Sequence, residues 1–202
     1  MAAPALILAS TSLRRLDLLR QIGVEPRAIC AADIDETPRK GELPRALAMR
    51  LAQEKAEAVV KQRAALPSAG DEVVLAADTV VAVGRRILPK AEREEEARAC
   101  LALLSGRAHR VYTAVMIARA DGLRRVRAVE SRVIFKRLSN SETEHYLRSG
   151  EWRGKAGGYA IQGLAASYIS FISGSYTGIV GLPLYETAHL LGSVGLVPQG
   201  PQ

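Results

Sequence analysis

One acidic residue stands inside an otherwise apolar stretch. Asp78 interrupts residues 73–83, which are nearly all aliphatic. An apolar run of this length predicts a strand at the centre of a sheet, where an unpaired charge would be costly. Asp78 must therefore be paired, bound to a metal or placed at an open strand edge, and each of these suits a catalytic base or a metal ligand. A structural Asp in a turn at the end of a shorter strand is the alternative interpretation.

A lysine interrupts an apolar ridge in a similar way. Lys55 lies four residues after Leu51 and four before Val59, so the three share one face of a helix expected over residues 46–66. This pattern points the Lys55 ammonium toward the interior as a compact charge. A side chain that snorkels to solvent is the alternative.

The loop at residues 10–15, Ser-Thr-Ser-Leu-Arg-Arg, joins a short apolar run to a helical pattern. A helix that begins here presents free backbone N–H groups at its positive end, beside hydroxyl donors such as Ser10. Arg14 and Arg15 are unfavourable in a first turn unless an anion is bound there. An ordinary serine N-cap with solvated arginines is the alternative.

Asp33, Asp35 and Glu36 form a small acidic cluster. Together with Asp78, these carboxylates are suitable oxygen ligands for a hard divalent cation. Taken in isolation, the cluster is typical of a solvated loop.

Several motifs are absent. Residues 150–155 resemble a P-loop, but one residue is missing from the spacing and Ala156 replaces the required Ser or Thr. No two glycines are separated by one residue and no G-x-S-x-G occurs. The three histidines, which we expect to be structural or exposed, lack metal-ligand spacing: His109, His145 and His189. The sequence thus argues against a P-loop NTPase, a serine hydrolase and a zinc enzyme.

The composition is that of an ordinary globular protein. The chain has 202 residues, 48% of them hydrophobic and 24% charged, with 28 Lys+Arg against 21 Asp+Glu and a net charge of +7. This basic balance reflects either coding bias, since 22 of the 28 are Arg, or a polyanionic partner. Two distant cysteines give no disulfide framework, and the apolar residues 2–9 are too short to span a bilayer. We expect a soluble cytoplasmic protein that binds no membrane.

The elements that position these residues alternate along the chain. We expect strands at 5–9, 73–83, 110–120, 124–138 and 168–172, with a hairpin turn at Asp121-Gly122. Helices are expected at about 13–22, 46–66, 92–104, 141–150 and 184–191, the fourth opened by a capping box of Ser141 and Glu144. Residues 194–202 are expected to form a loose tail. The fold class is α/β with a mixed sheet, because the hairpin is antiparallel and the strand–helix units favour parallel pairing.

Taken together, these segments resemble the Maf family of nucleotide pyrophosphatases. The residues that carry the resemblance are Leu-Ala-Ser-Thr-Ser-Leu-Arg-Arg at 8–15, Ala-Asp-Thr-Val-Val at 77–81, Leu-Ser-Gly at 104–106, Lys-Ala-Gly-Gly-Tyr-Ala-Ile-Gln-Gly at 155–163 and Gly-Leu-Pro-Leu at 181–184. The resemblance implies one Maf-like domain over residues 1–202, with an elongated mixed sheet flanked by helices. It also implies two lobes around a cleft, as in inosine-triphosphate pyrophosphatases, and a homodimer.

The resemblance further implies which residues act. Ser10, Arg14 and Arg15 match the family's phosphate-side loop, Lys55 and Lys90 its basic pair, and Asp78 its proton acceptor. Arg14, Thr79 and Gln162 match positions linked to substrate choice, and Lys155 belongs to a substrate-binding motif. Glu36 and Asp78 are the expected ligands of Mg²⁺ or Mn²⁺, with Asp35 as the alternative to Glu36. One departure from the family pattern is Lys90-Ala91, where the family has Lys-Pro and here the proline is Pro89.

The implied activity is hydrolysis of a nucleoside triphosphate to its monophosphate and pyrophosphate. Gln162 is typical of the subgroup that acts on dTTP and UTP, whereas the subgroup acting on 7-methyl-GTP has Glu there. Hydrolysis of 7-methyl-GTP or another modified nucleotide is one alternative. A nucleic-acid-binding regulator of division without enzymatic activity is another, although only 4% of residues are aromatic, which argues against a single-strand binder.

Overall fold

The computed structural model describes residues 4–66, 70 and 72–199. The elements follow the chain in the order β1 (Ala5–Leu8), α1 (Leu13–Gln21), β2 (Ala28–Ile29), α2 (Pro44–Arg63), β3 (Glu72–Val83), β4 (Arg86–Leu88), β5 (Lys90–Ala91), α3 (Glu94–Leu104), β6 (Ala108–Ala118), β7 (Arg124–Phe135), α4 (Asn140–Ser149), β8 (Lys155–Ala156), a 3₁₀ helix (Leu164–Tyr168), β9 (Ile169–Ser173), α5 (Tyr176–Val180) and α6 (Leu184–Gly192).

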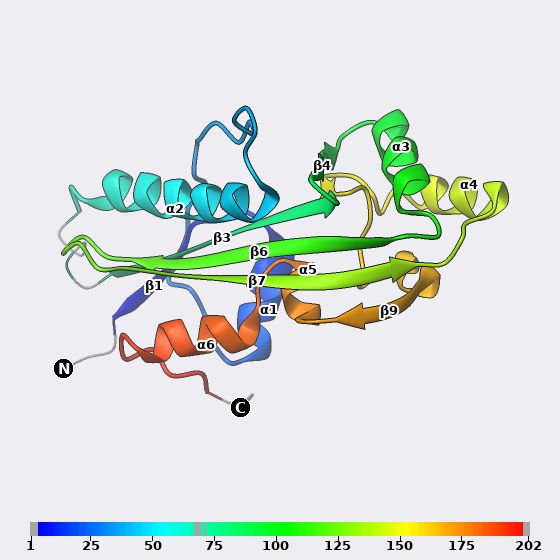
Figure 1. The fold of residues 1–202 in the computed structure, drawn as a ribbon. Coiled ribbons are helices and arrows are strands. Elements are labelled where there is room, and N and C mark those ends of the chain that lie inside the picture. The colour runs from blue at the N-terminus through cyan, green and yellow to red at the C-terminus, as the bar shows by residue number, and fades with distance from the viewer. Residues whose placement is uncertain (1–3, 67–69, 71, 200–202) are drawn as a thin grey trace.

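Most of the strands form one mixed sheet, which confirms the predicted fold class. Its order is β2-β1-β3-β6-β7-β9, with β4 also paired to β3. The β1–β2 and β1–β3 pairs are parallel, whereas the β3–β6, β6–β7 and β7–β9 pairs are antiparallel. The long β6–β7 hairpin, which the Asp121-Gly122 turn predicts, runs the length of the elongated molecule (Figure 1).

Helices cover both faces of this sheet (Figure 1). On one face, Leu47 and Leu51 of α2 pack in a buried cluster with Val74 of β3. On the other, α1 and α6 pack against the alternate residues of β3, such as Leu75. A third cluster lies at the far end, where α3 and α4 cover the continuation of the hairpin. No described helix has the length and apolar character needed to cross a membrane.

One predicted helix start is wrong by two residues. Helix α4 is capped by Ser139, whose hydroxyl accepts a hydrogen bond from the Glu142 backbone N–H, while the Glu142 carboxylate accepts one from the Ser139 N–H. The pattern Ser-x-x-Glu occurs twice in succession, at 139–142 and at 141–144. The first pair forms the cap, while Glu144 of the second pair is engaged in an ion pair with Arg98.

The beginning of the expected tail is packed. Val194 and Leu196 contact the cluster beneath α1 and α6, and the Val194 N–H donates to the Leu191 carbonyl over 3.0 Å. Val197 is exposed, and residues 200–202 lie outside the described residues.

The sheet has a gap beside the middle of β3. On that edge β1 pairs with residues 72–75 and β4 with residues 81–83. Among the described residues no strand pairs with this edge at Asp78 and Thr79, whose strand pairing is with β6 on the other side. Successive residues of a strand point to opposite faces. The side chains of Asp78 and Thr79 therefore lie on opposite faces of the sheet, and both can reach the same gap.

Candidate active site

A cavity of about 610 Å³ opens at this gap in the sheet. Asp78 and Thr79 both line it, although their side chains point to opposite faces of β3. The cavity is lined by ten of the residues that the sequence singles out: Ser10, Arg14, Arg15, Glu36, Lys55, Asp78, Thr79, Lys90, Lys155 and Gln162. The structure therefore brings these ten residues to one place, whereas Asp33 and Asp35 of the acidic cluster do not line the cavity. The chemical roles of the ten stay predictions.

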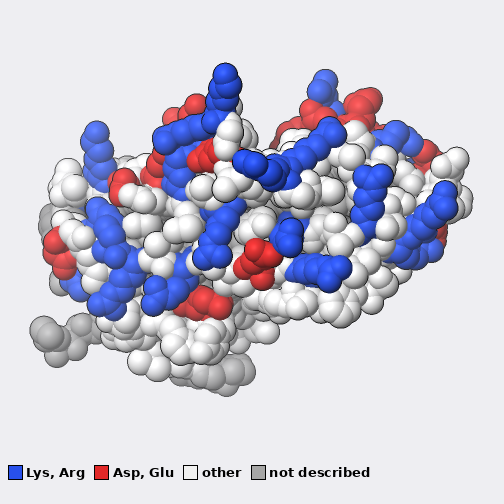
Figure 2. All heavy atoms as spheres, in the orientation of Figure 1, with Lys and Arg blue, Asp and Glu red and all other residues white. Residues whose placement is uncertain are grey.

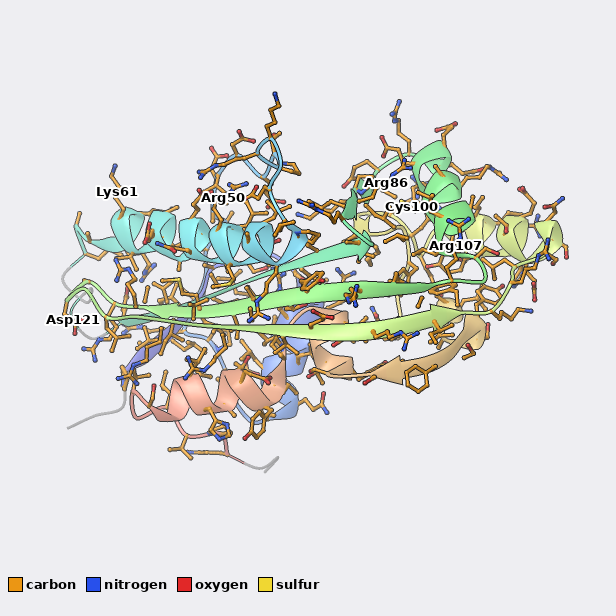
Figure 3. The ribbon with its side chains drawn as sticks, viewed as in Figure 1. Arg50, Lys61, Arg86, Cys100, Arg107 and Asp121 are labelled. Atoms are coloured by element: carbon orange, nitrogen blue, oxygen red, sulfur yellow. The ribbon has the colours of Figure 1, made fainter. Side chains whose placement is uncertain are left out.

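Lys55 and Asp78 form a buried ion pair at the base of the cavity. Lys55 Nζ lies 2.6 Å from Asp78 Oδ1, and the two residues are only 7% and 2% exposed. Asp78 is thus paired within a strand, which overturns the interpretation of an end-of-strand turn. Lys55 does not snorkel, in contrast to Lys61 of the same helix, which points away from the sheet (Figure 3).

Glu36 connects this pair to a second lysine. Its carboxylate lies 2.7 Å from Lys55 Nζ through one oxygen and contacts Lys90 through the other. Partial burial alone would raise the pKa of Glu36, but the hydrogen bonds from the two lysines outweigh it and hold that pKa at about 2. Asp35 is exposed, and its carboxylate accepts a hydrogen bond from the Thr37 backbone N–H. Of the two acidic candidates, Glu36 is therefore the one at the cavity.

The segment that carries Glu36 is irregular but anchored. Arg50 of α2 donates to the Glu42 carboxylate at 2.7 and 2.9 Å and to the Thr37 carbonyl at 3.1 Å. Figure 3 shows Arg50 rising from α2 toward this loop. These bonds fix the loop against the helix that supplies Lys55.

The start of α1 presents its N-terminal end to the cavity. Ser12 is the N-cap, but its side chain makes no capping hydrogen bond, which argues against the ordinary serine cap. Arg15 Nη1 instead donates to Ser10 Oγ at 3.0 Å, and Arg15 Nε donates to the Gly181 carbonyl at 2.9 Å. Burial lowers the pKa of Arg15, while Asp78 and Glu36 oppose that shift. Burial and the neighbouring Arg15 also lower the pKa of Arg14.

Two further cations come from a two-stranded sheet at the other wall. In the antiparallel pair β5–β8, Lys90 is opposite Ala156 and Ala91 is opposite Lys155. Burial and the charge of Arg14 lower the pKa of Lys155. The Pro89 carbonyl accepts a hydrogen bond from the Gly157 N–H at 2.9 Å, so Lys90 reaches the cavity despite the displaced proline.

The loop after β8 passes very close to β3. At Gly157, where φ is +70°, an added Cβ would lie 2.8 Å from Val81 Cγ1. Glycine is therefore required for the loop to approach the strand. The same loop continues to Gln162, which is exposed at the cavity rim.

The sequence did not identify every residue at the cavity. The Thr113 hydroxyl, which is 2.7 Å from the Gly178 carbonyl oxygen and 3.1 Å from Thr79 Oγ1, is buried behind the wall. Thr113 lies in an ordinary alternating strand, so no local signal marks it. Gly181 and Ile179 also line the cavity, and only the fold brings them to the α1 loop.

The donor set fits a magnesium ion that is shared with a phosphate ligand. Mg²⁺ is usually held by one or two carboxylates together with substrate phosphates and waters. Glu36 and Asp78 supply two carboxylates that share Lys55. Among the residues that the structure describes, no group of three or more His, Cys, Asp or Glu side chains forms a metal cage.

On the face of the molecule that Figure 2 shows, the charge is mixed. Figure 2 shows Lys and Arg distributed over the visible face, with Asp and Glu between them. The cavity is different, because it gathers five cationic and two acidic side chains. This excess of positive charge in the cavity suits a small anion.

Comparison with known proteins relates this chain to others along most of its length. A family model described as "Maf-like protein" matches residues 5–194. The chain is 61% identical over 192 residues to a "dTTP/UTP pyrophosphatase" of Rhodopseudomonas palustris (strain HaA2), covering 95% of this chain and 93% of that protein. It is 56% identical over 197 residues to one of Caulobacter vibrioides, covering 98% and 99%.

Among solved structures, the Ham1 protein of Staphylococcus aureus matches with a TM-score of 0.44 and 18% identity, over 65% of this chain and 71% of that one. This score is too low to establish a shared fold, so the predicted likeness to inosine-triphosphate pyrophosphatases stays a prediction.

Proposed function

Because the chain belongs to the Maf family, we propose that it hydrolyses dTTP and UTP to the monophosphate and pyrophosphate. Relatives about 60% identical over 95% of the chain carry the name dTTP/UTP pyrophosphatase. The observation that carries the proposal at the site is the convergence of Asp78, Lys55 and Glu36 with the α1 loop on one cavity.

Charge complementarity supports a triphosphate ligand. A nucleoside triphosphate carries about four negative charges near neutral pH, and its hydrolysis depends on positioning and on electrostatic stabilisation of the transferring group. The five cations Arg14, Arg15, Lys55, Lys90 and Lys155 face the cavity. The free N–H groups at the start of α1 add anion-binding donors.

Asp78 is the proposed proton acceptor. Its Oδ1 is held by Lys55 over 2.6 Å, which fixes the carboxylate at the base of the cavity, beside the cations. There it takes a proton from the water that attacks the phosphate, the role of a positioned general base. Lys55 is the positioning partner and also neutralises phosphate charge.

A divalent cation completes the proposal. Glu36 and Asp78 would hold Mg²⁺ or Mn²⁺ together with phosphate oxygens, and the ion would supply Lewis-acid stabilisation of the phosphate charge. In this structure Lys55 and Lys90 form ion pairs with the Glu36 carboxylate. When Glu36 binds the cation instead, both lysines would be available to bind the phosphates.

The pyrimidine preference follows from the rim of the cavity. Gln162 has an amide that both donates and accepts, which suits the imide edge of uracil or thymine. The same reaction on 7-methyl-GTP or on a modified pyrimidine nucleotide is the alternative substrate choice. On the face that Figure 2 shows, Asp and Glu lie between the Lys and Arg side chains, which does not favour a nucleic-acid-binding role there.

The test is pyrophosphate release from dTTP, UTP and 7-methyl-GTP, each with Mg²⁺. We expect faster turnover of dTTP and UTP than of 7-methyl-GTP, and loss of turnover after metal chelation. Equal rates on all three substrates would refute the proposed specificity, and absence of pyrophosphate would refute the activity.

We also propose that the chain acts as one domain, as a homodimer in the cytoplasm. Light scattering after size exclusion tests the oligomeric state.

A further inference from the structure

One wall of the cavity is a segment without regular secondary structure. Residues 157–163 belong to no helix or strand. Four of them line the cavity: Tyr159, Ala160, Ile161 and Gln162. In a helix or a sheet, the backbone N–H and C=O groups are paired by the element itself. Here other partners must hold the backbone, and those partners determine the shape of the wall.

A side chain of helix α4 supplies one of these partners. Tyr146 is fully buried, and its hydroxyl oxygen accepts a hydrogen bond from the Ala160 backbone N–H over 3.0 Å. Ala160 is itself only 6% exposed, so solvent does not readily replace this acceptor. A buried N–H without an acceptor is costly. The wall is therefore held in the position from which Ala160 reaches Tyr146.

Glu151, two residues after the end of α4, holds the other end of the wall. Its carboxylate accepts a hydrogen bond from the Leu164 N–H over 2.7 Å, and an added Cβ at Gly163 would lie only 2.1 Å from Glu151 Oε2. Between the two anchors, the Gly163 N–H donates to the Ala160 carbonyl over 3.1 Å, which closes a tight turn that contains Gln162. Side chains thus fix both ends of this turn.

Helix α4 gives these contacts a firm support. The Trp152 indole N–H donates to the Leu147 carbonyl over 2.8 Å, which ties the segment after the helix back to its last turn. The rings of Tyr146 and Tyr168 meet edge to face with their centroids 6.1 Å apart, an arrangement that favours one orientation of the Tyr146 ring. The positions of the Tyr146 hydroxyl and the Glu151 carboxylate therefore follow from the packing around α4.

The opposite wall is held by different elements. Asp78 and Lys55 pair between β3 and α2, and Glu36 joins that pair from a loop anchored to α2. Helices α2 and α4 lie toward opposite ends of the elongated molecule (Figure 1). Within the described part of the chain, no hydrogen bond or ion pair joins Tyr146 or Glu151 to these three side chains. A shift of the wall near α4 is therefore expected to leave the proposed chemical groups in place.

We propose that Tyr146 and Glu151 are positioning residues, which hold the turn at residues 160–163 in place for nucleotide binding. Neither residue is among those that line the cavity, so both act from behind its wall. This inference rests on the proposed function, because it takes the cavity as the nucleotide site. Loosening the turn weakens binding of the ground state and of the transition state alike, which raises KM and leaves kcat nearly unchanged.

The test measures kcat and KM for UTP in the full-length chain. Tyr146→Phe removes one oxygen atom and keeps the ring. We expect KM to rise about fivefold or more and kcat to stay within about twofold. Tyr168→Phe is the matched control, because its hydroxyl belongs to the same buried cluster but lies 3.5 Å from the Glu142 carbonyl at the start of α4. A hydrogen bond of that length is weak, so we expect both constants to stay within about twofold of wild type.

A second pair of variants tests the other anchor. Glu151→Gln keeps an oxygen acceptor for the Leu164 N–H, whereas Glu151→Ala removes it. We expect KM to stay within about twofold in Glu151→Gln and to rise about fivefold or more in Glu151→Ala. This pair decides the question if Tyr146→Phe does not fold.

Three results would overturn the inference: an unchanged KM in Tyr146→Phe, an equal rise of KM in Tyr168→Phe, or a fall in kcat as large as the rise in KM. A merely structural role lowers the amount of folded enzyme, and hence the apparent kcat, without a change in KM. Failure of the wild-type chain to release pyrophosphate from UTP would instead contradict the proposed function.

Discussion

Lys55 Nζ and Asp78 Oδ1 are 2.6 Å apart in a buried ion pair that joins α2 to the central strand β3. Neither residue is expected in its position from packing alone, because each interrupts an apolar pattern. Because the two charges neutralise each other, the ion pair explains why both residues stand in otherwise apolar patterns. The pair also places a carboxylate and an ammonium next to each other at the base of a cavity, where they are available for chemistry.

Replacement of the proposed base is the first test of the mechanism. Asp78→Asn keeps the size of the side chain but removes the proton acceptor, so we expect kcat to fall by about 10²–10⁴-fold, the usual contribution of a general base. Binding of a non-hydrolysable UTP analogue, measured by calorimetry, is expected to change little. Retained turnover would exclude Asp78 from this role.

Loss of Lys55 is expected to affect stability as well as activity. Lys55→Met leaves Asp78 as a buried carboxylate without this partner, and breaking such a pair costs about 3–5 kcal/mol. Urea denaturation measures the change in the free energy of unfolding. The matched control is Lys61→Met on the exposed face of the same helix (Figure 3), for which we expect a change within about 0.5 kcal/mol. Equal effects of the two substitutions would contradict the structural assignment of Lys55.

Gln162 offers a test of base recognition. In Gln162→Glu the amide donor is replaced by a carboxylate, which repels the carbonyl oxygens of uracil and thymine. We expect kcat/KM for dTTP and UTP to fall by about tenfold or more, the effect of roughly 1.4 kcal/mol, relative to 7-methyl-GTP. Gln62→Glu, on the exposed surface of α2, adds the same charge away from the cavity and serves as the control. An unchanged order of preference would show that recognition lies elsewhere.

A buried histidine predicts how stability depends on pH. His109 is 2% exposed and lies 2.8 Å from the Tyr159 hydroxyl through Nε2, and burial lowers its pKa to about 4. The unfolded chain takes up a proton below about pH 6.5 and the folded chain only below about pH 4. The free energy of unfolding is therefore expected to fall as pH drops from about 6.5 to 4, by up to about 3 kcal/mol.

Denaturation of His109→Gln across this pH range checks the assignment. The variant is expected to lose the His109 contribution to the slope, whereas His145→Gln, at an exposed position, is expected to keep it. The same slope in wild type and in His109→Gln would contradict the prediction.

The sequence predicted those parts of the fold that have a local signal. The apolar run of β3, the hairpin turn at residues 121–122 and the helical ridge around Lys55 are all visible as periodicity or turn chemistry, and the structure confirms them. The helix cap lies two residues before the predicted one, because two Ser-x-x-Glu spacings overlap at 139–142 and 141–144 and the local pattern is the same for both.

Contacts between distant segments had no such signal. Arg15 donates to the Gly181 carbonyl across 166 positions, and β5 pairs with β8 through only two residues on each strand. A two-residue strand is too short for alternation to show. Asp78, Lys55 and the loop at residues 10–15 were predicted from residue patterns, and other site residues from family motifs. Thr113, which lies opposite Thr79, is apparent only when the strands are placed side by side.

The alternation of β3 also constrains insertions and deletions. Asp78 faces the α2 side and its neighbour Thr79 faces the opposite side, where Thr113 and Gly178 lie. A shift of register by a single residue would exchange the two side chains between these environments. The number of β3 residues that precede Asp78 therefore matters more to the site than which aliphatic residues they are. Substitution of one aliphatic residue of β3 by another leaves Asp78 and Thr79 in place, whereas insertion or deletion of one residue moves both side chains to the wrong face.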